Sequence, residues 1–288
     1  MELIIYGIVN SVSLILMSIG FALVYGVSRV PNFAHGALFI LTGYMTWVFY
    51  NTLGLPYFVS ILLALIFIGI VGALLYQVIL IRVRGMPISE IIASFGISLA
   101  ILELLRWAGL KGGTYMLPPF ISGTVRFLGV SIDYQRIIII FGGMALLAFL
   151  WLFTTHTKTG LALKAIAQNE RAALALGIDS DMAATVAVAL GAVFAGIGGV
   201  FLLPLGNITV EMGYEVLIFA IAVSVVGGLG SWKGAVYASF LIGFAQILTV
   251  RFIASHWHFV VALLVIIIVL IAKPSGFFGR QKELEERV

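Results

Sequence analysis

Long runs of apolar residues, separated by short polar segments, dominate this chain from end to end. A membrane-crossing helix needs about 20 apolar residues, with about 17–25 usual. The second and seventh of the candidate runs are short, which favours re-entrant or broken segments there. Nine such runs are present, at 3–27, 36–51, 57–81, 89–108, 136–155, 183–203, 214–228, 235–252 and 257–272.

The composition strengthens this interpretation. The chain is 62% hydrophobic and 10% charged, with a mean hydropathy of +1.19. Soluble domains carry about 25% charged residues, so this chain has too few to cover a water-facing surface. The length of the runs indicates helices and not a barrel. We therefore expect a single all-α polytopic membrane domain over residues 1–288 with eight or nine transmembrane helices.

The most strongly charged interruption is the segment 157–181, here called the polar loop. A compact, ordered loop of this kind is a candidate docking element for a soluble partner, since its many alanines leave it slim enough to enter a groove. The alternative is an ordinary loop with helical propensity. Its charged residues are Lys158, Lys164, Glu170, Arg171, Asp179 and Asp181.

Local signals predict two short helices within the polar loop. The first is expected to begin after Gly160 and to run through Gln168. Asn169 can cap the second, because its side-chain oxygen accepts the free N–H groups of the next turn. Glu170 then lies at the positive end of that helix, and Gly177 suits its C-terminal end.

The distribution of Lys and Arg predicts the topology. With the polar loop placed in the cytoplasm, eleven basic residues fall inside and five fall outside or at its margin. This bias agrees with the positive-inside rule. It places the C-terminal tail, 273–288, in the cytoplasm as a short helix end, and 109–135 outside as the longest external segment. Nine spans put the N-terminus outside, whereas eight put it inside.

A break is expected between the first two apolar runs, near 28–36. Pro31 lacks a backbone N–H, and Asn32, His35 and Gly36 are poor residues for the interior of a membrane helix. A break at membrane depth is tolerated only if protein covers it or it lines a cavity. Asn32 and His35 are therefore candidates for the translocation pathway or its gate. The alternative is a plain cytoplasmic turn in which Asn32 caps the next helix.

Other polar groups also fall near the predicted spans. The first run contains Asn10, and its small and polar face, with Ser11, Ser18 and Gly7, either packs against other helices or lines a cavity. Glu103 and Arg106 are three residues apart and can pair on one helix face. Glu215 lies at the outer mouth of a pathway, contacts a soluble binding protein, or sits on a solvated edge. Asn10 and Glu215 are therefore further candidates for the pathway or its gate.

Several kinds of chemistry are disfavoured. The chain has no cysteine, so it has neither disulfides nor thiolate chemistry. The four histidines and the serines form no recognisable metal or nucleophile pattern, so we expect neither an enzyme nor a metal site. The glycine-rich segment 226–235 lacks the Gly-Lys-Ser/Thr ending of a phosphate loop. No basic cluster interleaves with aromatic residues, which argues against nucleic acid as a partner.

The polar loop resembles the cytoplasmic coupling loop of ABC-importer permeases. It is more specifically similar to the branched-chain amino acid permease family, LivH type. The segments 25–36, 226–235 and 273–279 resemble the same family and follow its order, so the resemblance covers most of the chain. Within the polar loop it rests on Thr157, Gly160, Ala167, Asn169, Ala172, Ala173, Leu176, Gly177, Ile178 and Asp179.

The resemblance implies a permease subunit that moves branched-chain or other hydrophobic amino acids, although relatives take urea, amides or aromatic acids. It implies a short coupling helix that docks into an ATP-hydrolysing subunit, so ATP and its chemistry belong to the partner and this chain carries no cofactor. The residues it assigns to ATPase coupling are Gly160, Lys164, Asn169, Glu170, Ala172, Ala173 and Gly177.

The same resemblance implies the assembly. Two ABC ATPase subunits, a second related permease of the LivM type and a periplasmic or extracellular solute-binding protein are the expected partners, in a bacterial or archaeal cytoplasmic (inner) membrane. A self-sufficient secondary transporter or channel for a small neutral solute is the alternative, and a non-transporting scaffold is a third. Secondary transporters place ionisable groups near the midplane, whereas Glu90, Glu103 and Glu215 fall near span ends.

Overall fold

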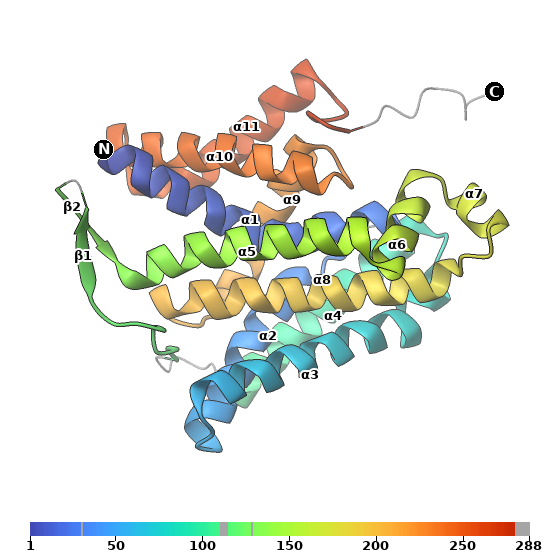
Figure 1. Ribbon diagram of the computed structural model, residues 1–288, viewed down its shortest axis with the longest axis horizontal. Helices are drawn as coiled ribbons and strands as arrows, with labels where there is room; N and C mark the ends of the chain where they lie inside the picture. The colour runs from blue at the N-terminus through green and yellow to red at the C-terminus, as the bar shows by residue number, and fades with distance from the viewer. Residues whose placement is uncertain (30, 110–114, 128, 280–288) are drawn as a thin grey trace.

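A computed structural model describes residues 1–29, 31–109, 115–127 and 129–279 of the chain (Figure 1). Its first half contains four helices and one hairpin. The helices are α1 (Glu2–Ser28), α2 (His35–Trp47, extended by a π-helical turn Val48–Thr52), α3 (Tyr57–Val78, followed by a 3₁₀ turn Leu80–Val83) and α4 (Pro87–Ala108), and the hairpin strands are β1 (Thr124–Phe127) and β2 (Val130–Asp133).

The described part of the second half contains seven α-helices. The polar loop supplies two of them, between two long membrane helices. They are α5 (Tyr134–His156), α6 (Lys158–Gln168), α7 (Glu170–Ala175), α8 (Ser180–Leu202, with a 3₁₀ turn Leu203–Leu205), α9 (Glu211–Gly227), α10 (Trp232–Phe252) and α11 (His258–Ala272, preceded by a 3₁₀ turn Ser255–Trp257).

The expected all-α membrane architecture is confirmed. Within the described residues, seven helical segments are long and apolar enough to cross a membrane: α1, α3, α4, α5, α8, α10 and α11. The two remaining predicted spans are α2 and α9, with 13 and 17 residues. They correspond to the second and seventh apolar runs, the two that the sequence singled out as short.

The helices divide into a central and a peripheral group. Of the most apolar 18-residue stretch of each helix, 78% is buried within the chain in α1 and 67% in α8, but only 11% in α11. Small residues allow the central pair to approach closely: a Cβ on Gly20 of α1 would collide with the carbonyl of Gly191 of α8. The peripheral helices present their leucines and isoleucines outward, as a lipid-facing surface does.

The two ends of the helical bundle differ in character. The β1–β2 hairpin lies at one end, and α6 and α7 lie at the other, with α5 running between them (Figure 1). The start of α1 is at the hairpin end, because the Tyr6 hydroxyl donates to the Ser131 carbonyl at 3.2 Å. The N-terminus and the polar loop are therefore at opposite ends of the bundle.

The hairpin was not expected from the sequence. Its antiparallel strands pair Thr124 with Asp133 and Phe127 with Val130. The β-branched residues Val125 and Ile132 stand opposite each other in this register and favour extended structure. The hairpin occupies only part of the predicted external segment 109–135.

The C-terminal segment 273–279 packs against the C-terminal end of α9. Phe277 and Phe278 donate their backbone N–H groups to the carbonyls of Val226 and Gly227, each at 2.9 Å. The predicted helix end at residues 280–288 lies outside the described residues. The docked part of the tail is nevertheless at the same end of the bundle as the polar loop (Figure 1).

Candidate functional site: the polar loop and the adjoining cavity

The first helix of the polar loop begins earlier than the sequence suggested. It starts at Lys158 and not after Gly160, because the Thr157 side chain caps it by accepting the Gly160 N–H at 3.0 Å. Gly160 therefore lies inside the first turn. It packs against the backbone of Phe153 so closely that no Cβ would fit. The glycine is needed there for the tight corner between α5 and α6.

The ends of α7 form as predicted. The Asn169 side chain accepts the Ala172 N–H at 3.1 Å and caps the helix start. At the other end Gly177 has φ +80°, a conformation that side chains other than glycine's rarely adopt. The Gly177 N–H reaches the Leu174 carbonyl and the Ile178 N–H reaches the Ala173 carbonyl, which together constitute a Schellman motif.

One face of the polar loop is anchored on the bundle. Leu163, Ile166 and Ala173 are buried against α1 and α8, in a cluster with Val27, Ala183 and Ala187. Ala173, which the sequence assigned to coupling, thus faces inward. The opposite face carries Lys164 and Ala172 in exposed positions. It also exposes three large apolar side chains: Leu161, Leu174 and Leu176.

An arginine network fastens the polar loop to the segment between α3 and α4. One Arg84 nitrogen, Nη2, lies 2.9 Å from Glu170 Oε1 and 3.0 Å from the Ser180 hydroxyl. The other, Nη1, donates to Asp181. Burial acts to lower the pKa of Arg84, but Tyr76 and the two carboxylates outweigh burial, and the net shift is upward. Arg84 therefore stays cationic.

Sequence reasoning did not find this network. Arg84 entered only as one of the basic residues of the inner side, and its partners lie 86 to 97 positions further along the chain. A second contact was missed in the same way: Arg29 Nη2 donates to the Ala167 carbonyl at 3.3 Å. Arg29 is at the C-terminal end of α1, so both arginines hold the polar loop against the bundle.

The predicted break between the first two runs reaches membrane depth. His35, the first residue of α2, has Nε2 2.8 Å from the carbonyl of Met17, which lies near the middle of the 27-residue α1. Among the described residues of the break, Asn32, Ala34 and His35 are buried, whereas Pro31 and Phe33 are half-buried. Asn32 Oδ1 accepts the Ala34 N–H at 3.0 Å, and Ser94 Oγ of α4 accepts the Phe33 N–H at 3.2 Å. Asn32 thus turns the chain just before α2, but it does not cap that helix as the alternative expected, because the N-cap is Ala34 and no side chain caps it.

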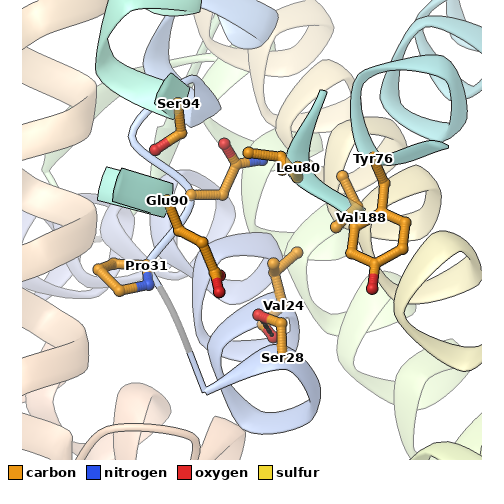
Figure 2. Close-up of a pocket in the computed structure, with 9 residues that line it drawn as sticks. Val24, Ser28, Pro31, Tyr76, Leu80, Glu90, Ser94 and Val188 are labelled. Atoms are coloured by element: carbon orange, nitrogen blue, oxygen red, sulfur yellow. Dashed lines mark hydrogen bonds between the residues drawn. The ribbon is translucent and has the colours of Figure 1, made fainter. Parts of the chain in front are cut away.

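A small cavity of about 20 Å³ adjoins this break, enough for an ordered water. Figure 2 shows Glu90 reaching from the start of α4 toward Val24 and Ser28. The Glu90 carboxylate is buried and accepts the Gly85 N–H at 2.7 Å. The complete lining is Val24, Ser28, Pro31, Asn32, Tyr76, Leu80, Glu90, Ser94 and Val188.

The other candidate pathway residues lie on α1 and α9. Asn10 Nδ2 donates to the Gly243 carbonyl at 3.1 Å and to Gln246 Oε1 at 2.9 Å, and so joins α1 to α10. Glu215 is exposed on α9. The structure therefore brings Asn32 and His35 together at the break, whereas Asn10 joins α1 to α10. Glu215 lies on α9 two residues beyond Gly213, whose carbonyl faces Gly36 beside His35.

The acidic and basic residues near the hairpin end form a surface cluster. Arg106 Nη1 lies 3.4 Å from Glu103, the pair that the three-residue spacing predicted. Arg106 Nη2 lies 3.4 Å from Glu211 at the start of α9. All three side chains are substantially exposed, so each contact contributes about 0–1 kcal/mol.

These features define a polytopic helical membrane protein with an ordered polar loop at one end and a buried helix break beside it. A family model described as "Branched-chain amino acid transport system / permease component" matches residues 3–270, almost the whole chain. The chain belongs to this family of ABC transport permeases. It is accordingly a membrane subunit and not an enzyme, and ATP is bound by a partner ATPase.

Several curated relatives match over most of their length. The permease LivH of Escherichia coli K12, described as high-affinity and branched-chain, is 28% identical over 283 residues, with 92% of this chain and 91% of LivH covered. BraD of Pseudomonas aeruginosa is 28% identical over 279 residues, with 92% and 91% covered. A probable LivH of Methanocaldococcus jannaschii is 27% identical over 292 residues, with 95% and 90% covered.

The fold is also found in a solved structure. PsaBC from Streptococcus pneumoniae, in complex with Fab, superimposes with a TM-score of 0.53 over 100% of this chain and 96% of that chain. The two sequences are 12% identical, so the likeness concerns the fold alone. Membership of the family places the chain in a bacterial or archaeal multi-pass transport system that includes ATPase and binding-protein partners.

Proposed function

We propose that this chain is the translocating subunit of an ATP-driven importer for branched-chain or other hydrophobic amino acids, which a soluble binding protein delivers. The polar loop is its ATPase-docking element. One observation carries this assignment: Leu176 is 81% exposed beside the ordered Schellman turn of α7. Leu161 and Leu174 are also exposed on this charged loop, and a group of exposed apolar side chains marks an interaction surface.

The docking contacts follow from the two faces of the polar loop. Gly160, Asn169, Ala173 and Gly177 set its shape or anchor it. The exposed side chains of Lys164 and Ala172 lie on the face that meets the partner, next to Leu161, Leu174 and Leu176. Glu170 helps to anchor the polar loop, since its carboxylate is paired with Arg84 of the same chain, and it lies beside the face that meets the partner.

The pathway passes the break between α1 and α2. Asn32 and His35 are its leading candidates, because their buried polar side chains adjoin a cavity or a neighbouring carbonyl at membrane depth. Asn10 and Glu215 are candidates for its outer part. The path carries few fixed charges, which suits a permease that releases a neutral zwitterionic solute and leaves recognition to the binding protein.

The assembly comprises this chain, a second related permease of the LivM type, and two ABC ATPase subunits. The C-terminus is cytoplasmic in this arrangement, on the side of the ATPases. This orientation is supported by the segment 273–279, whose backbone docks on α9 at the end of the bundle that carries the polar loop.

The test is purification of the tagged chain from its native membrane in mild detergent, followed by mass spectrometry and uptake of radiolabelled leucine, isoleucine and valine into vesicles. We expect an ABC ATPase and a second permease to co-purify, and uptake to require ATP. Recovery of the chain alone, with uptake that survives ATP depletion, would overturn the proposal in favour of a secondary transporter or channel.

A further inference from the structure

The segment joining α3 to α4 lies between the polar loop and the cavity, and it contacts both. On one side Arg84 reaches Glu170 at the start of α7 and Asp181 at the start of α8. On the other side Gly85, the next residue, donates its N–H to Glu90 in the cavity wall at 2.7 Å. Two adjacent residues therefore span the distance from the docking element to the break.

This connection is short and geometrically constrained. Arg84 binds two carboxylates with different nitrogens of one planar guanidinium, an arrangement that fixes its orientation as well as its position. Gly85 has φ +85°, a backbone conformation that side chains other than glycine's rarely adopt. The Gly85 N–H belongs to the planar peptide unit that begins at Arg84, so a shift of the Arg84 backbone changes the direction of this N–H.

The cavity end of the connection is equally close. Glu90 shares the cavity lining with Asn32 of the break and with Ser94, whose hydroxyl accepts the Phe33 N–H. Tyr76 also connects the arginine network to the cavity, because its hydroxyl donates to Asp181 at 3.3 Å and the residue lines the same cavity. Figure 2 shows Glu90 and Tyr76 on facing sides of the space.

We propose that Arg84 is the positioning residue that transmits displacement of the polar loop to the cavity wall, through Gly85 and Glu90, and so links ATPase movement to the gate at the break. The inference rests on the proposed function, since it presupposes that an ATPase moves the polar loop. It adds a residue that the family resemblance did not assign. Arg84 contacts neither solute nor ATPase in this role.

The first experiment compares Arg84→Gln with Arg82→Gln in the assembled transporter. Arg82 is a matched control, because it lies two residues away, is exposed, and belongs to the same connecting segment. We expect Arg84→Gln to retain the ATPase and basal ATP hydrolysis while leucine uptake per ATP falls roughly tenfold, within the usual range of coupling between linked sites. Arg82→Gln should resemble the wild type, and Arg84→Lys should recover part of the uptake.

A double-mutant cycle with Glu170→Gln tests the contact itself. If Arg84 acts through Glu170, the double variant should transport no worse than Arg84→Gln alone, because one lost contact cannot be lost twice. Additive losses, equal losses in Arg84→Gln and Arg82→Gln, or unchanged uptake per ATP in Arg84→Gln would each overturn the inference.

If uptake is too low to measure, a thiol in the cavity lining reports movement of the cavity wall instead. The chain has no cysteine, so Val188→Cys provides a single thiol in the cavity lining. We expect ATP to change its rate of labelling by N-ethylmaleimide, and Arg84→Gln to abolish that change. An ATP-dependent change that persists in Arg84→Gln overturns the inference. A wild-type chain that captures no ATPase refutes the proposed function instead, so the two failures are distinguishable.

Discussion

His35 Nε2 lies 2.8 Å from the carbonyl oxygen of Met17, and this contact fixes the first residue of α2 to the middle of α1. A carbonyl only accepts, so Nε2 carries the proton in this contact. The His35 ring also meets Phe21 edge-on, with 5.9 Å between ring centroids. The histidine thus supports the helix break by a hydrogen bond and by packing at once.

Replacing His35 tests both contributions. His35→Ala removes the ring and the donor from a fully buried site, so we expect a loss of about 2–4 kcal/mol in folding stability, combining a cavity with a lost hydrogen bond. His35→Gln keeps a donor and should lose less. The measurement is thermal inactivation of the purified chain in detergent. Equal stability of His35→Ala and wild type would show that the contact contributes nothing.

Gly36 allows α2 and α9 to touch. A Cβ at this position would collide with the carbonyl of Gly213, so Gly36→Ala must push the two short helices apart. We expect a destabilisation of about 1–3 kcal/mol, typical of overpacking. Gly96→Ala is the matched control, because Gly96 is within α4 and a Cβ there meets nothing within 4 Å. A similar loss in both variants would contradict the close-approach argument.

Gly177 shapes the C-terminal end of α7, and Gly177→Val forces a β-branched residue into a backbone with φ +80°. We expect normal membrane insertion, weaker ATPase stimulation and uncoupled uptake. Gly129→Val imposes the same strain at φ +80° in the hairpin at the other end of the bundle, and should leave ATPase co-purification unchanged. Uptake at the wild-type level in Gly177→Val would remove Gly177 from the coupling role.

Leu176 tests docking without disturbing the fold. Because the side chain is exposed, Leu176→Asp should leave thermal stability unchanged while recovery of the ATPase falls by roughly tenfold, equivalent to about 1.4 kcal/mol. The control is Ile271→Ala, at an equally exposed site on α11. An aspartate there would place a charge on a lipid-facing helix, so Ile271→Asp is not used. Full recovery of the ATPase with Leu176→Asp would place the docking contact elsewhere.

Asn10 joins α1 to α10 through the Gly243 carbonyl and Gln246. Such interhelical hydrogen bonds in membranes contribute about 0.6 kcal/mol on average and up to about 1.7. We expect Asn10→Ala to lower stability by that amount, and the added Gln246→Ala to cost only what its separate hydrogen bond to the His258 carbonyl contributes. A large fall in uptake at unchanged stability would instead support the pathway role of Asn10.

The sequence predicted best what local chemistry decides. The apolar runs locate the membrane helices because each helix satisfies its own backbone in lipid. Asn169 and Gly177 mark the two ends of α7 because capping depends on a few neighbouring residues. The start of α6 was placed too late because the capping threonine, Thr157, was overlooked although its hydroxyl-bearing side chain directly precedes the helix.

What escaped prediction depends on contacts between distant segments. Nothing near Arg84 indicates that its partners are Glu170 and Asp181, because no periodic pattern relates these positions. The hairpin was missed because its two strands have four residues each, too few to show alternation clearly. The inward orientation of Ala173 likewise follows from how the polar loop packs on α1 and α8.

The hydrogen bond from the Phe33 N–H to Ser94 Oγ links the break to α4. The backbone amide at the break has lost its helical partner, and in a dry interior an unpaired amide is costly. If α4 slid along its own axis, that amide would lose its acceptor unless water replaced it. This hydrogen bond therefore ties the break to α4, and an opening that preserves it must occur along their boundary with α1, α3 and α8.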